Sequence, residues 1–425
     1  MINFKYILLG AFLGLLAPMN AQNTKEEILD DDSLQTEVSD SAMVDSLQAD
    51  SIPNLPWPES VKYRIDRLLE SKMFETSQVG MMVWDLSSDS CIYAHNARWL
   101  MRPASCMKLV TAITALDKLG GSYQFKTQLK YTGAIHENVI DGDVYCVGGM
   151  DPRFNNDDLS AFVSSLKELG VDTIRGNIYA DNSMKDANPY GEGWCWDDKN
   201  YTLTPLLLGR KDQFMSRFIS KLREVGIYYA GYGSSEKRCP SDAFLITTRT
   251  HSIDQILTRM MKESDNLYAE SMYYQIAAST GNRPASARSA RSVERQLISK
   301  IGLDDGRYKL ADGSGLSLYN YVSPELLVRL LRYAYQNENI YNHLRSALPI
   351  AGVDGTLKKR MRGTFAQDNV HAKTGTVTGI ISLAGYCKAS NNHMLCFAII
   401  NQGIMHGSNA RAFQDRVCNA LCQPQ

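Results

Sequence analysis

The stretch "ASCMKL", residues 104–109, places Ser105 and Lys108 three positions apart. Side chains at this spacing lie on one face of a helix, and a lysine beside a serine can take the hydroxyl proton and activate the oxygen as a nucleophile. Pro103 suits the first turn of a helix, and the segment up to residue 119 is apolar on most faces, as in a buried helix. The alternative is an ordinary helix start whose lysine reaches solvent. Taken alone, the motif favours that alternative.

A second candidate is "KESDNLYAE". Ser264 could relay a proton, and the amide of Asn266 could hold a substrate carbonyl. However, Ser, Asp and Asn are also the preferred N-caps of helices, and the helical segment "LYAESMYYQIAA" that follows needs one. By itself, this stretch favours a cap.

A third candidate is "HAKTGTVTG". Strand alternation puts Lys373 and Gly375 on one side, and Thr374 and Thr376 on the other. A glycine inside a strand often marks a point where another backbone approaches closely. A lysine and hydroxyl groups beside such a point could bind a carboxylate, whereas an edge strand protected by a charge is an equally supported alternative.

The length and charge of the chain limit the kind of protein that it can be. With 425 residues, the chain is longer than one core usually organises, so we expect two or more units. Residues 22–51 contain nine acidic residues and one lysine, whereas the whole chain has a net charge of −1. The remainder is therefore mildly basic, but its basic residues do not cluster, and we expect no nucleic-acid partner.

The N-terminal segment is typical of an exported protein. Residues 1–21 combine Lys5, the apolar run "YILLGAFLGLL" and the small-residue exit "MNA", which together predict a signal peptide. Residues 22–57 are too polar and charged to form a core and predict an acidic, disordered linker. The apolar run is too short for a comfortable membrane span, and no later stretch is long enough. We therefore expect a periplasmic protein with at most peripheral contact with membrane or wall.

Metal and cofactor frameworks are missing from the sequence. The nine cysteines include no C-x-x-C pair, and the pair His136-Glu137 lacks a second histidine one turn later. No G-x-S-x-G elbow occurs either. We predict neither a metal nor an organic cofactor.

Two cysteines near the C-terminus flank a turn. A two-residue turn at Asn391-Asn392 would set Cys387 opposite Cys396 as a pair with close side chains. Export makes oxidation to a disulfide possible. Two buried free thiols are an equally supported alternative, because the register can slip by one residue.

The order of patterns along the chain predicts a discontinuous domain. Strands precede the helix of residues 105–119, helices follow from about residue 252, and strands return before a last helix at 408–421. The middle section contains short strands and two amphipathic helices, "DDLSAFVSSLKELG" and "DQFMSRFISKLREVG". We expect residues 58–124 and 246–425 to share one sheet, with residues 125–245 inserted as a smaller domain.

Together, the three candidate stretches are more specific than each is alone. Ser-x-x-Lys, Ser-Asp-Asn and Lys-Thr-Gly occur in the order found in β-lactamases and penicillin-binding proteins. With "AHNARWLMRPASCMKLVTA", "GGMDPRF", "GWCWDD", "ADGSGLSLYNYVSPELL" and "LPIAGVDGTLKKRM", the sequence resembles the class C low-molecular-mass penicillin-binding proteins, the D-alanyl-D-alanine carboxypeptidase/endopeptidases. The likeness runs from about Val79 to Gln402. It implies an α+β fold of the serine β-lactamase and penicillin-binding-protein type, an antiparallel sheet flanked by helices, with an inserted smaller α/β domain.

The resemblance also implies a mechanism. Ser105 would attack the carbonyl between two D-alanines of a peptidoglycan stem peptide and form an acyl-enzyme that water clears. Lys108 would be the base, and both burial and the nearby cation Lys373 would lower its pKa. Ser264 would pass the proton to the leaving amine, and Asn266 would hold the substrate amide.

Substrate binding would use the third stretch. Lys373 and Thr374 would bind the terminal carboxylate, and the backbone N–H groups of Ser105 and Thr376 would form the oxyanion hole. The substrate would lie along this strand as an added strand. β-Lactam antibiotics would acylate the same serine.

One further residue is implied as a specificity determinant. Asp151 precedes Pro152 in a turn that we expect to be exposed and rigid. The resemblance implies that Asp151 meets the charged end of the diamino acid of the stem peptide, whereas the residues alone favour an Asx-type bond that closes the turn. Cys106 departs from the threonine usual in the family, and we expect the site to tolerate it.

Two rival functions use the same motifs. A β-lactamase needs a second base for fast deacylation, and Glu294 lies at a comparable distance after Ser-Asp-Asn, but without the asparagine expected to follow it. A non-catalytic wall-binding protein of this fold would not need the intact motif residues. Both rivals are therefore less consistent with the sequence than a carboxypeptidase.

Overall fold

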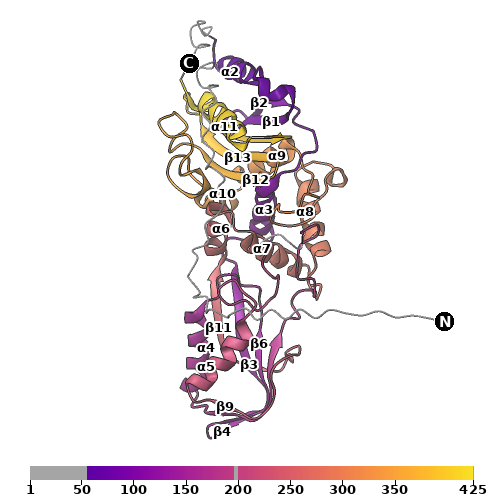
Figure 1. Cartoon of the computed structure of the whole chain (residues 1–425), viewed down its shortest axis with the longest axis vertical. Coiled ribbons are helices and arrows are strands. Elements are labelled where there is room, and N and C mark those ends of the chain that lie inside the picture. Colours follow the sequence, from indigo (N-terminus) through magenta and orange to yellow (C-terminus); the bar gives the residue numbers. More distant parts are fainter. Residues whose placement is uncertain (1–54, 196–199, 425) are drawn as a thin grey trace, which may run out of the picture. The chain divides into compact units, whose positions relative to one another are not determined.

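The computed structural model describes residues 55–195 and 200–424. The predicted signal peptide and residues 22–54 of the predicted linker lie outside the described residues. The described part of residues 54–425 forms one compact unit, whose helices and strands are labelled in Figure 1.

A five-stranded antiparallel sheet in the order β12-β13-β14-β1-β2 joins the two ends of this unit. Its strands are β1 (Gln78–Asp85), β2 (Ser90–His95), β12 (His371–Val377), β13 (Ile380–Lys388) and β14 (Met394–Gln402). β1 pairs with β14 along its whole length, from Gln78 opposite Gln402 to Asp85 opposite Leu395. The shared sheet expected from the sequence is therefore present.

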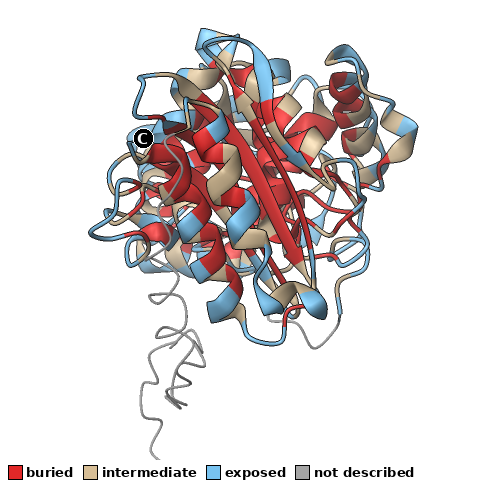
Figure 2. Cartoon of the chain, turned by 90° about the horizontal axis from the view of Figure 1, so that it is seen from above, coloured by how far each residue is buried: buried red, intermediate tan, exposed pale blue. Residues whose placement is uncertain are grey.

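Helices cover both faces of this sheet, and its central strands are buried on both sides (Figure 2). α2 (Glu59–Leu69) and α11 (Gly407–Cys422) pack on one face, and α9 (Pro324–Tyr335) packs on the other. The remaining helices on the α9 side are α3 (Met107–Leu119), α6 (Ile253–Lys262), α7 (Asn266–Ala278), α8 (Ala287–Lys300) and α10 (Glu338–Ala347). This layering confirms the predicted α+β fold class.

α3 is the central helix of that layer. Every residue from Met107 to Leu116 is buried, and α3 packs against α7, α8 and α9. It ends at Gly120, whose φ of 80° is a conformation that glycine adopts at low cost. The predicted buried helix is confirmed, and Lys108 lies within its first turn.

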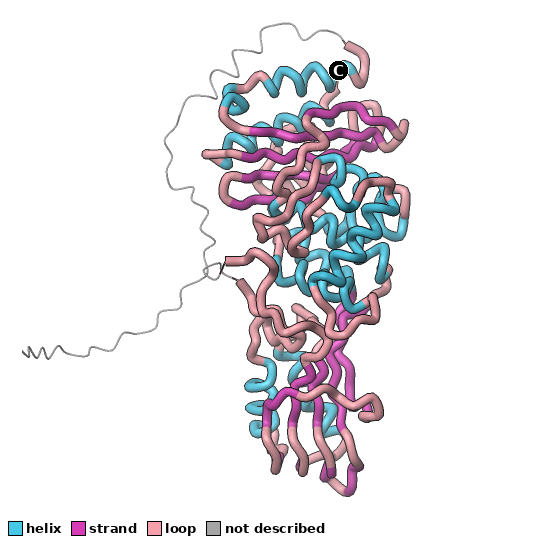
Figure 3. Tube along the Cα trace, turned by 90° about the vertical axis from the view of Figure 1, so that its right-hand side faces the viewer, coloured by secondary structure: helices cyan, strands magenta, loops and turns pink. Residues whose placement is uncertain are grey.

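The inserted segment, residues 124–252, begins and ends in two paired strands, β3 (Gln124–Tyr131) and β11 (Phe244–Ser252), with Gln124 opposite Ser252. It contains a five-stranded sheet in the order β10-β8-β6-β3-β11 and a four-stranded sheet in the order β4-β5-β7-β9 (Figure 3). The further elements are β4 (Ala134–His136), β5 (Val139–Asp141), β6 (Val144–Val147), α4 (Asn156–Glu168), β7 (Thr173–Ile174), β8 (Ile178–Asp181), α5 (Phe214–Glu224), β9 (Tyr228–Tyr229) and β10 (Gly233–Glu236). β11 continues beyond the predicted boundary at residue 245. Because the described chain is one compact unit, its division into two domains stays a prediction.

The hairpin that joins β13 and β14 differs from the expected one. Tyr386, and not Cys387, lies opposite Cys396. Ala389 pairs with His393 across the turn, and Asn392 takes a left-handed φ of 70°, so the loop has one residue more than a two-residue turn. This slip by one residue turns the two thiols to opposite faces of the sheet, where they join different apolar clusters. The predicted disulfide is wrong, and both cysteines are buried free thiols.

Candidate active site

Ser105 lies in η3 (Ala104–Cys106), a short 3-10 helix that continues directly into α3. Ala104 has a φ of 47°, a left-handed conformation that is costly for a residue with a side chain. Gly375 of β12 lies against this turn, where a Cβ atom at residue 375 would be 2.9 Å from Ser105 N. The close approach of another backbone at Gly375 is therefore confirmed, and it brings the edge strand beside Ser105.

Lys108 is completely buried and contacts residues of three different segments. Its Nζ lies 2.9 Å from Ser105 Oγ, 2.7 Å from Asn266 Oδ1 and 2.7 Å from the main-chain oxygen of Ser314. The two carbonyl oxygens can only accept hydrogen bonds, whereas the serine hydroxyl can also donate one. A neutral Lys108 amine can therefore donate to both carbonyls and accept the proton of Ser105.

Burial lowers the pKa of Lys108 to about 8, and the negative charges of Asp312 and Glu270 oppose this effect. An appreciable fraction of the amine, roughly one tenth at pH 7, is then neutral. From the sequence, Lys373 was expected to contribute to this shift. The structure attributes the shift to burial, and the charge of Lys108 instead helps to lower the pKa of Lys373.

The loop between α6 and α7 carries Ser264 and Asn266. Ser264 has a φ of 58°, a strained conformation for serine. Asp265 is the N-cap of α7, because its Oδ1 accepts from the N–H of Leu267 at 3.1 Å. The capping alternative is therefore correct for Asp265, and it leaves the side chains on either side of it free to point toward the two buried lysines.

Lys373 of β12 is also completely buried. Its Nζ donates to Ser264 Oγ at 2.8 Å and to the main-chain oxygen of Thr374 at 2.6 Å. Burial, followed by the positive charge of Lys108, lowers the pKa of Lys373 to about 7. The three sequence motifs thus meet in one network, in which Ser105 and Ser264 each contact a lysine.

The two threonines of β12 lie differently from each other. Thr374 Oγ1 donates to Thr356 Oγ1 at 2.7 Å, and Thr356 belongs to η5 (Gly355–Leu357). Thr376 is exposed. β12 is an edge strand of its sheet, with β13 as its neighbour, so its outer edge has main-chain groups that an extended ligand could pair with.

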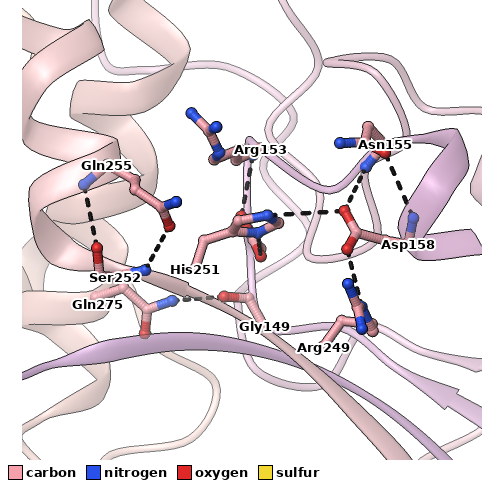
Figure 4. Close-up of polar contacts among 10 residues, drawn as sticks. Gly149, Arg153, Asn155, Asp158, Arg249, His251, Ser252, Gln255 and Gln275 are labelled. Carbon is pink, nitrogen blue, oxygen red and sulfur yellow. Dashed lines mark hydrogen bonds and ion pairs between the residues drawn. The ribbon is translucent and has the colours of Figure 1, made fainter. Parts of the chain in front are cut away.

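Asp151 lies in the inserted segment, between β6 and α4, and contacts His251 of β11, which is labelled in Figure 4. Its side chain is 0% exposed, with Oδ2 2.7 Å from His251 Nδ1, and Oδ1 accepts from the N–H of Arg153 at 3.0 Å. The expected exposure of Asp151 is wrong, because β11 places His251 directly over the turn. The carboxylate closes an Asx-type turn, and it would have to leave His251 in order to meet a substrate side chain.

The turn at residues 312–317 has a role in the site that was not predicted from the sequence. Asp312 accepts hydrogen bonds from Gly315 N and Ser317 N, both at 2.8 Å, and from Asn320 Nδ2 at 2.7 Å. These bonds orient the main-chain oxygen of Ser314 toward Lys108. The only signal in the sequence is an acid followed by a glycine-rich turn, "DGSG", which does not reveal that a carbonyl faces a lysine.

Two more buried acids lie behind Lys108 on α7 and α8. Glu270 accepts from Gly313 N at 3.0 Å, and burial raises its pKa to about 8. Glu294 accepts from Thr111 at 3.4 Å, and burial raises its pKa well above the usual range. An acid inside an otherwise apolar helix, as in "NLYAESMYY", is the pattern that could have indicated Glu270.

Within residues 55–195 and 200–424, no group of three or more His, Cys, Asp or Glu side chains could hold a metal ion. No helix in the described part of the chain has the length and apolar character that a membrane span requires.

The chain has an antiparallel sheet between two layers of helices. A serine–lysine pair lies at the start of the central helix α3, and a second lysine lies on the edge strand β12. These features define the class of penicillin-recognising serine enzymes. The model of the D-Ala-D-Ala carboxypeptidase 3 (S13) family matches residues 61–207 and 210–422. The chain belongs to this family and is a serine-type peptidase.

Relatives support this assignment over most of the chain. D-alanyl-D-alanine carboxypeptidase DacB of Haemophilus influenzae is 25% identical over 423 residues, which covers 80% of this chain and 88% of the relative. The D-alanyl-D-alanine carboxypeptidase of Actinomadura sp. is 26% identical over 454 residues and covers 84% of both chains. The crystal structure of penicillin-binding protein 4 from H. influenzae has the same fold, with a TM-score of 0.76 at 24% identity over 84% of this chain and 98% of that one.

Proposed function

We propose that Ser105 is the nucleophile of this D-alanyl-D-alanine carboxypeptidase and that its substrate is a peptidoglycan stem peptide. Ser105 Oγ attacks the carbonyl carbon between the two terminal D-alanines. The C–N bond breaks, the terminal D-alanine leaves as an amine, and the acyl-enzyme on Ser105 is hydrolysed by water. Cleavage of cross-links between stem peptides, an endopeptidase activity, uses the same steps.

The observation that carries the proposal is the environment of Lys108. A completely buried amine lies 2.9 Å from Ser105 Oγ, and two carbonyl oxygens accept its other hydrogen bonds. This arrangement leaves the lone pair of the neutral amine directed at the serine proton, as a general base requires. A pKa of about 8 lets Lys108 accept that proton near neutral pH.

Ser264 and Lys373 fit the second proton transfer. Lys373 Nζ donates to Ser264 Oγ at 2.8 Å, so the hydroxyl proton of Ser264 is free to move to the departing amine. Asn266, whose Oδ1 accepts from Lys108, has an amide NH₂ group that can donate to a substrate carbonyl. The neighbouring positions of these side chains support their assignment as relay and substrate-binding residues.

The edge strand fits the binding of the substrate backbone and carboxylate. The N–H groups of Ser105 and Thr376 form the proposed oxyanion hole, and the N-terminus of α3, which directly follows η3, adds a favourable dipole. Lys373 and Thr374 are the proposed ligands of the terminal carboxylate. A bound carboxylate favours the charged form of Lys373 and raises its pKa above the value in the empty site.

The buried position of Glu294 speaks against a β-lactamase. Fast deacylation needs an ionised base next to the acyl-enzyme, but Glu294 is 0% exposed, and burial raises its pKa well above the usual range, which disfavours the ionised form. Its described hydrogen-bond partner is Thr111 and not Ser105. The intact network around Lys108 likewise favours an enzyme over a non-catalytic wall-binding protein.

β-Lactams should bind the same serine covalently and act as inhibitors. A solved structure of penicillin-binding protein 4 from H. influenzae, 25% identical to this chain, contains a β-lactam. For this chain, we propose acylation of Ser105, export to the periplasm through the N-terminal segment, and no requirement for a metal or organic cofactor.

The test combines labelling with digestion. Wild type and Ser105→Ala are incubated with a fluorescent penicillin, and the labelled peptide is identified by mass spectrometry. Label on the peptide that contains Ser105, lost in the variant, supports the proposal, whereas label on both proteins or on neither contradicts it. Digestion of purified muropeptides then measures the release of D-alanine and the opening of cross-links.

A further inference from the structure

Two side chains of the inserted segment reach the network around Lys108. They are Trp194 and Arg210, which both lie in the connection between β8 and α5. We propose that Trp194 and Arg210 are positioning residues. They hold in place the two loops that carry the carbonyl acceptors of Lys108, which are Asn266 Oδ1 and the main-chain oxygen of Ser314. This inference rests on the proposed roles of Lys108 and Ser264.

The first contact is made by the indole of Trp194. Its Nε1 donates to Asp312 Oδ2 at 2.7 Å. Asp312 is 1% exposed and holds the turn whose Ser314 main-chain oxygen accepts from Lys108. The indole N–H is therefore one of the donors that set the position of a direct partner of the proposed base.

The loop around Trp194 is built for this contact. A Cβ atom at Gly191 would lie 2.6 Å from the indole ring, so only glycine lets the ring lie this close to the loop backbone. Glu192 pairs with Arg291 of α8 at 2.8 Å. Gly193 has a φ of 80°, and a Cβ atom there would be 2.7 Å from Ser317 Oγ. The three consecutive residues before Trp194 thus all favour the packing of this loop against the rest of the chain, outside the inserted segment (residues 55–123 and 253–424, here called the peptidase half).

The second contact is made by the guanidinium of Arg210. Its NH2 group lies 2.8 Å from Asp265 Oδ2, and the side chain of Asp265 is only 2% exposed. Arg210 itself has a left-handed φ of 70°, and its guanidinium stacks over the ring of Tyr201 at 4.5 Å. Arg259 of α6 also donates to Asp265 at 2.8 Å, so the carboxylate is held from both the peptidase half and the inserted segment.

The two acids occupy equivalent places in the network. Asp265 directly precedes Asn266, whose Oδ1 accepts from Lys108, and Asp312 precedes Ser314, whose main-chain oxygen accepts from the same Nζ. Asp265 also follows Ser264, which is held at a φ of 58°. Such strained residues persist where the surroundings hold them in place. By holding both acids, the inserted segment orients the base and steadies the proposed proton relay.

The experiment measures penicillin acylation of the full chain as a function of pH in Trp194→Phe, Arg210→Gln and Arg210→Lys. Phenylalanine keeps the ring but not the N–H group, and glutamine removes the positive charge. Each change leaves a carboxylate near Lys108 less compensated, which raises the pKa of Lys108. The other groups that act on the pKa of Lys108, namely Glu270 and Cys106, stay unchanged, as does the neighbouring Lys373.

We expect the acylation rate at pH 7 to fall about ten-fold in Trp194→Phe and Arg210→Gln, the effect of losing one hydrogen bond to a charged group. The acid limb of the pH profile should move to higher pH in both variants. Arg210→Lys should recover most of the Arg210→Gln shift, because it retains the charge.

Asp89 offers a matched control. It accepts from an indole, Trp84 Nε1 at 3.0 Å, and from the guanidinium of Arg332 at 2.5 Å. It lies in the turn between β1 and β2, at the opposite edge of the sheet from β12. Trp84→Phe and Arg332→Gln therefore remove the same two kinds of bond and should leave the acylation profile unchanged.

Circular dichroism and thermal melting establish that each variant folds. If Trp194→Phe does not fold, Arg210→Lys and Arg210→Gln still test the proposal. If folded variants keep the wild-type acylation rate and pH profile, the proposal is wrong. It is also wrong if the rate falls but the acid limb of the pH profile does not move. If the limb moves for only one of the two side chains, the proposal is wrong for the other. Ser105→Ala is run in parallel, because failure to label wild type at Ser105 refutes the proposed nucleophile and not the positioning role.

Discussion

The Sγ atom of Cys106 lies 3.2 Å from the main-chain oxygen of Lys373. The residue after the proposed nucleophile thus joins η3 to the edge strand that carries the second buried lysine. The thiol is completely buried, and burial raises its pKa. At this position, the site uses a small hydrogen-bond donor and not a reactive thiolate.

Cys106→Thr should therefore acylate with penicillin at close to the wild-type rate, because a hydroxyl can donate to the same carbonyl. Cys106→Ala loses that donor and should be slower by roughly five-fold, the effect of one neutral hydrogen bond. Fluorescent penicillin labelling over time measures both. In the native protein, iodoacetamide should leave Cys106 unmodified, and rapid alkylation there would show that the thiol is exposed or ionised.

The pH dependence of acylation follows from the pKa of Lys108. The value is lowered from 10.5 to about 8, so the neutral amine predominates above pH 8 and is depleted below it. The acylation rate should fall about ten-fold per pH unit below pH 8 and level off above it. If the acid limb of the pH profile instead lay near the usual pKa of lysine, Lys108 would be in contact with water in the active protein.

The matched variant for this measurement is Lys108→Ala, which removes the base and leaves Ser105 in place. It should acylate orders of magnitude more slowly and show no limb at pH 8. Thermal melting checks that the variant folds, as replacing a costly buried amine should permit.

The buried contact between Asp151 and His251 predicts a mainly structural effect for Asp151→Asn. The variant keeps the turn but weakens a buried charge-assisted bond, so it should lose roughly 1 to 3 kcal/mol of unfolding free energy. His251→Gln should destabilise the protein in the same way. Chemical denaturation of both variants measures this loss.

Substrate comparison separates this result from a role in specificity. If Asp151 is structural, Asp151→Asn changes penicillin acylation and peptide turnover by the same factor. A loss confined to peptides with a free side-chain amine would instead show that Asp151 leaves His251 to contact the substrate.

The proposed site residues could be singled out from the sequence because each lies in a short motif whose local geometry is set by one element. Ser105 and Lys108 share one helical turn, and the order of the three motifs indicated that Ser264 and Lys373 would join them. The structure places Ser105 within hydrogen-bond distance of Lys108, and Ser264 within hydrogen-bond distance of Lys373. The sheet shared by the two ends of the chain followed from the order of strands and helices, and the fold class followed from the family resemblance of the motifs.

What the sequence could not predict depends on contacts between distant segments. The carbonyl of Ser314 has no side-chain signature, and its position depends on Asp312. The burial of Asp151 depends on His251, one hundred residues later. The hairpin register depends on the left-handed φ of Asn392, which allows one additional loop residue and turns Cys387 away from Cys396.

β12 approaches the proposed nucleophile so closely that a side chain at residue 375 should disturb the site. A Cβ atom at residue 375 would lie 2.2 Å from Ser382 Oγ, 2.8 Å from the main-chain oxygen of Pro103 and 2.9 Å from Ser105 N. Two of these neighbours are backbone atoms, which cannot rotate away as a side chain can. Gly375→Ala must therefore push β12 from η3 and widen the proposed oxyanion hole between Ser105 N and Thr376 N.

A displacement of about 1 Å can lower a rate by roughly 100-fold, so Gly375→Ala should acylate with penicillin about 100-fold more slowly than wild type. Gly407→Ala is the matched control, because a Cβ atom there would meet its nearest neighbour, Ile381 Cδ1, at 3.4 Å, an ordinary contact. The control should acylate normally, and both variants should melt as folded proteins. Normal acylation by a folded Gly375→Ala would mean that β12 can withdraw without harm, and that Thr376 N is not a donor to the oxyanion.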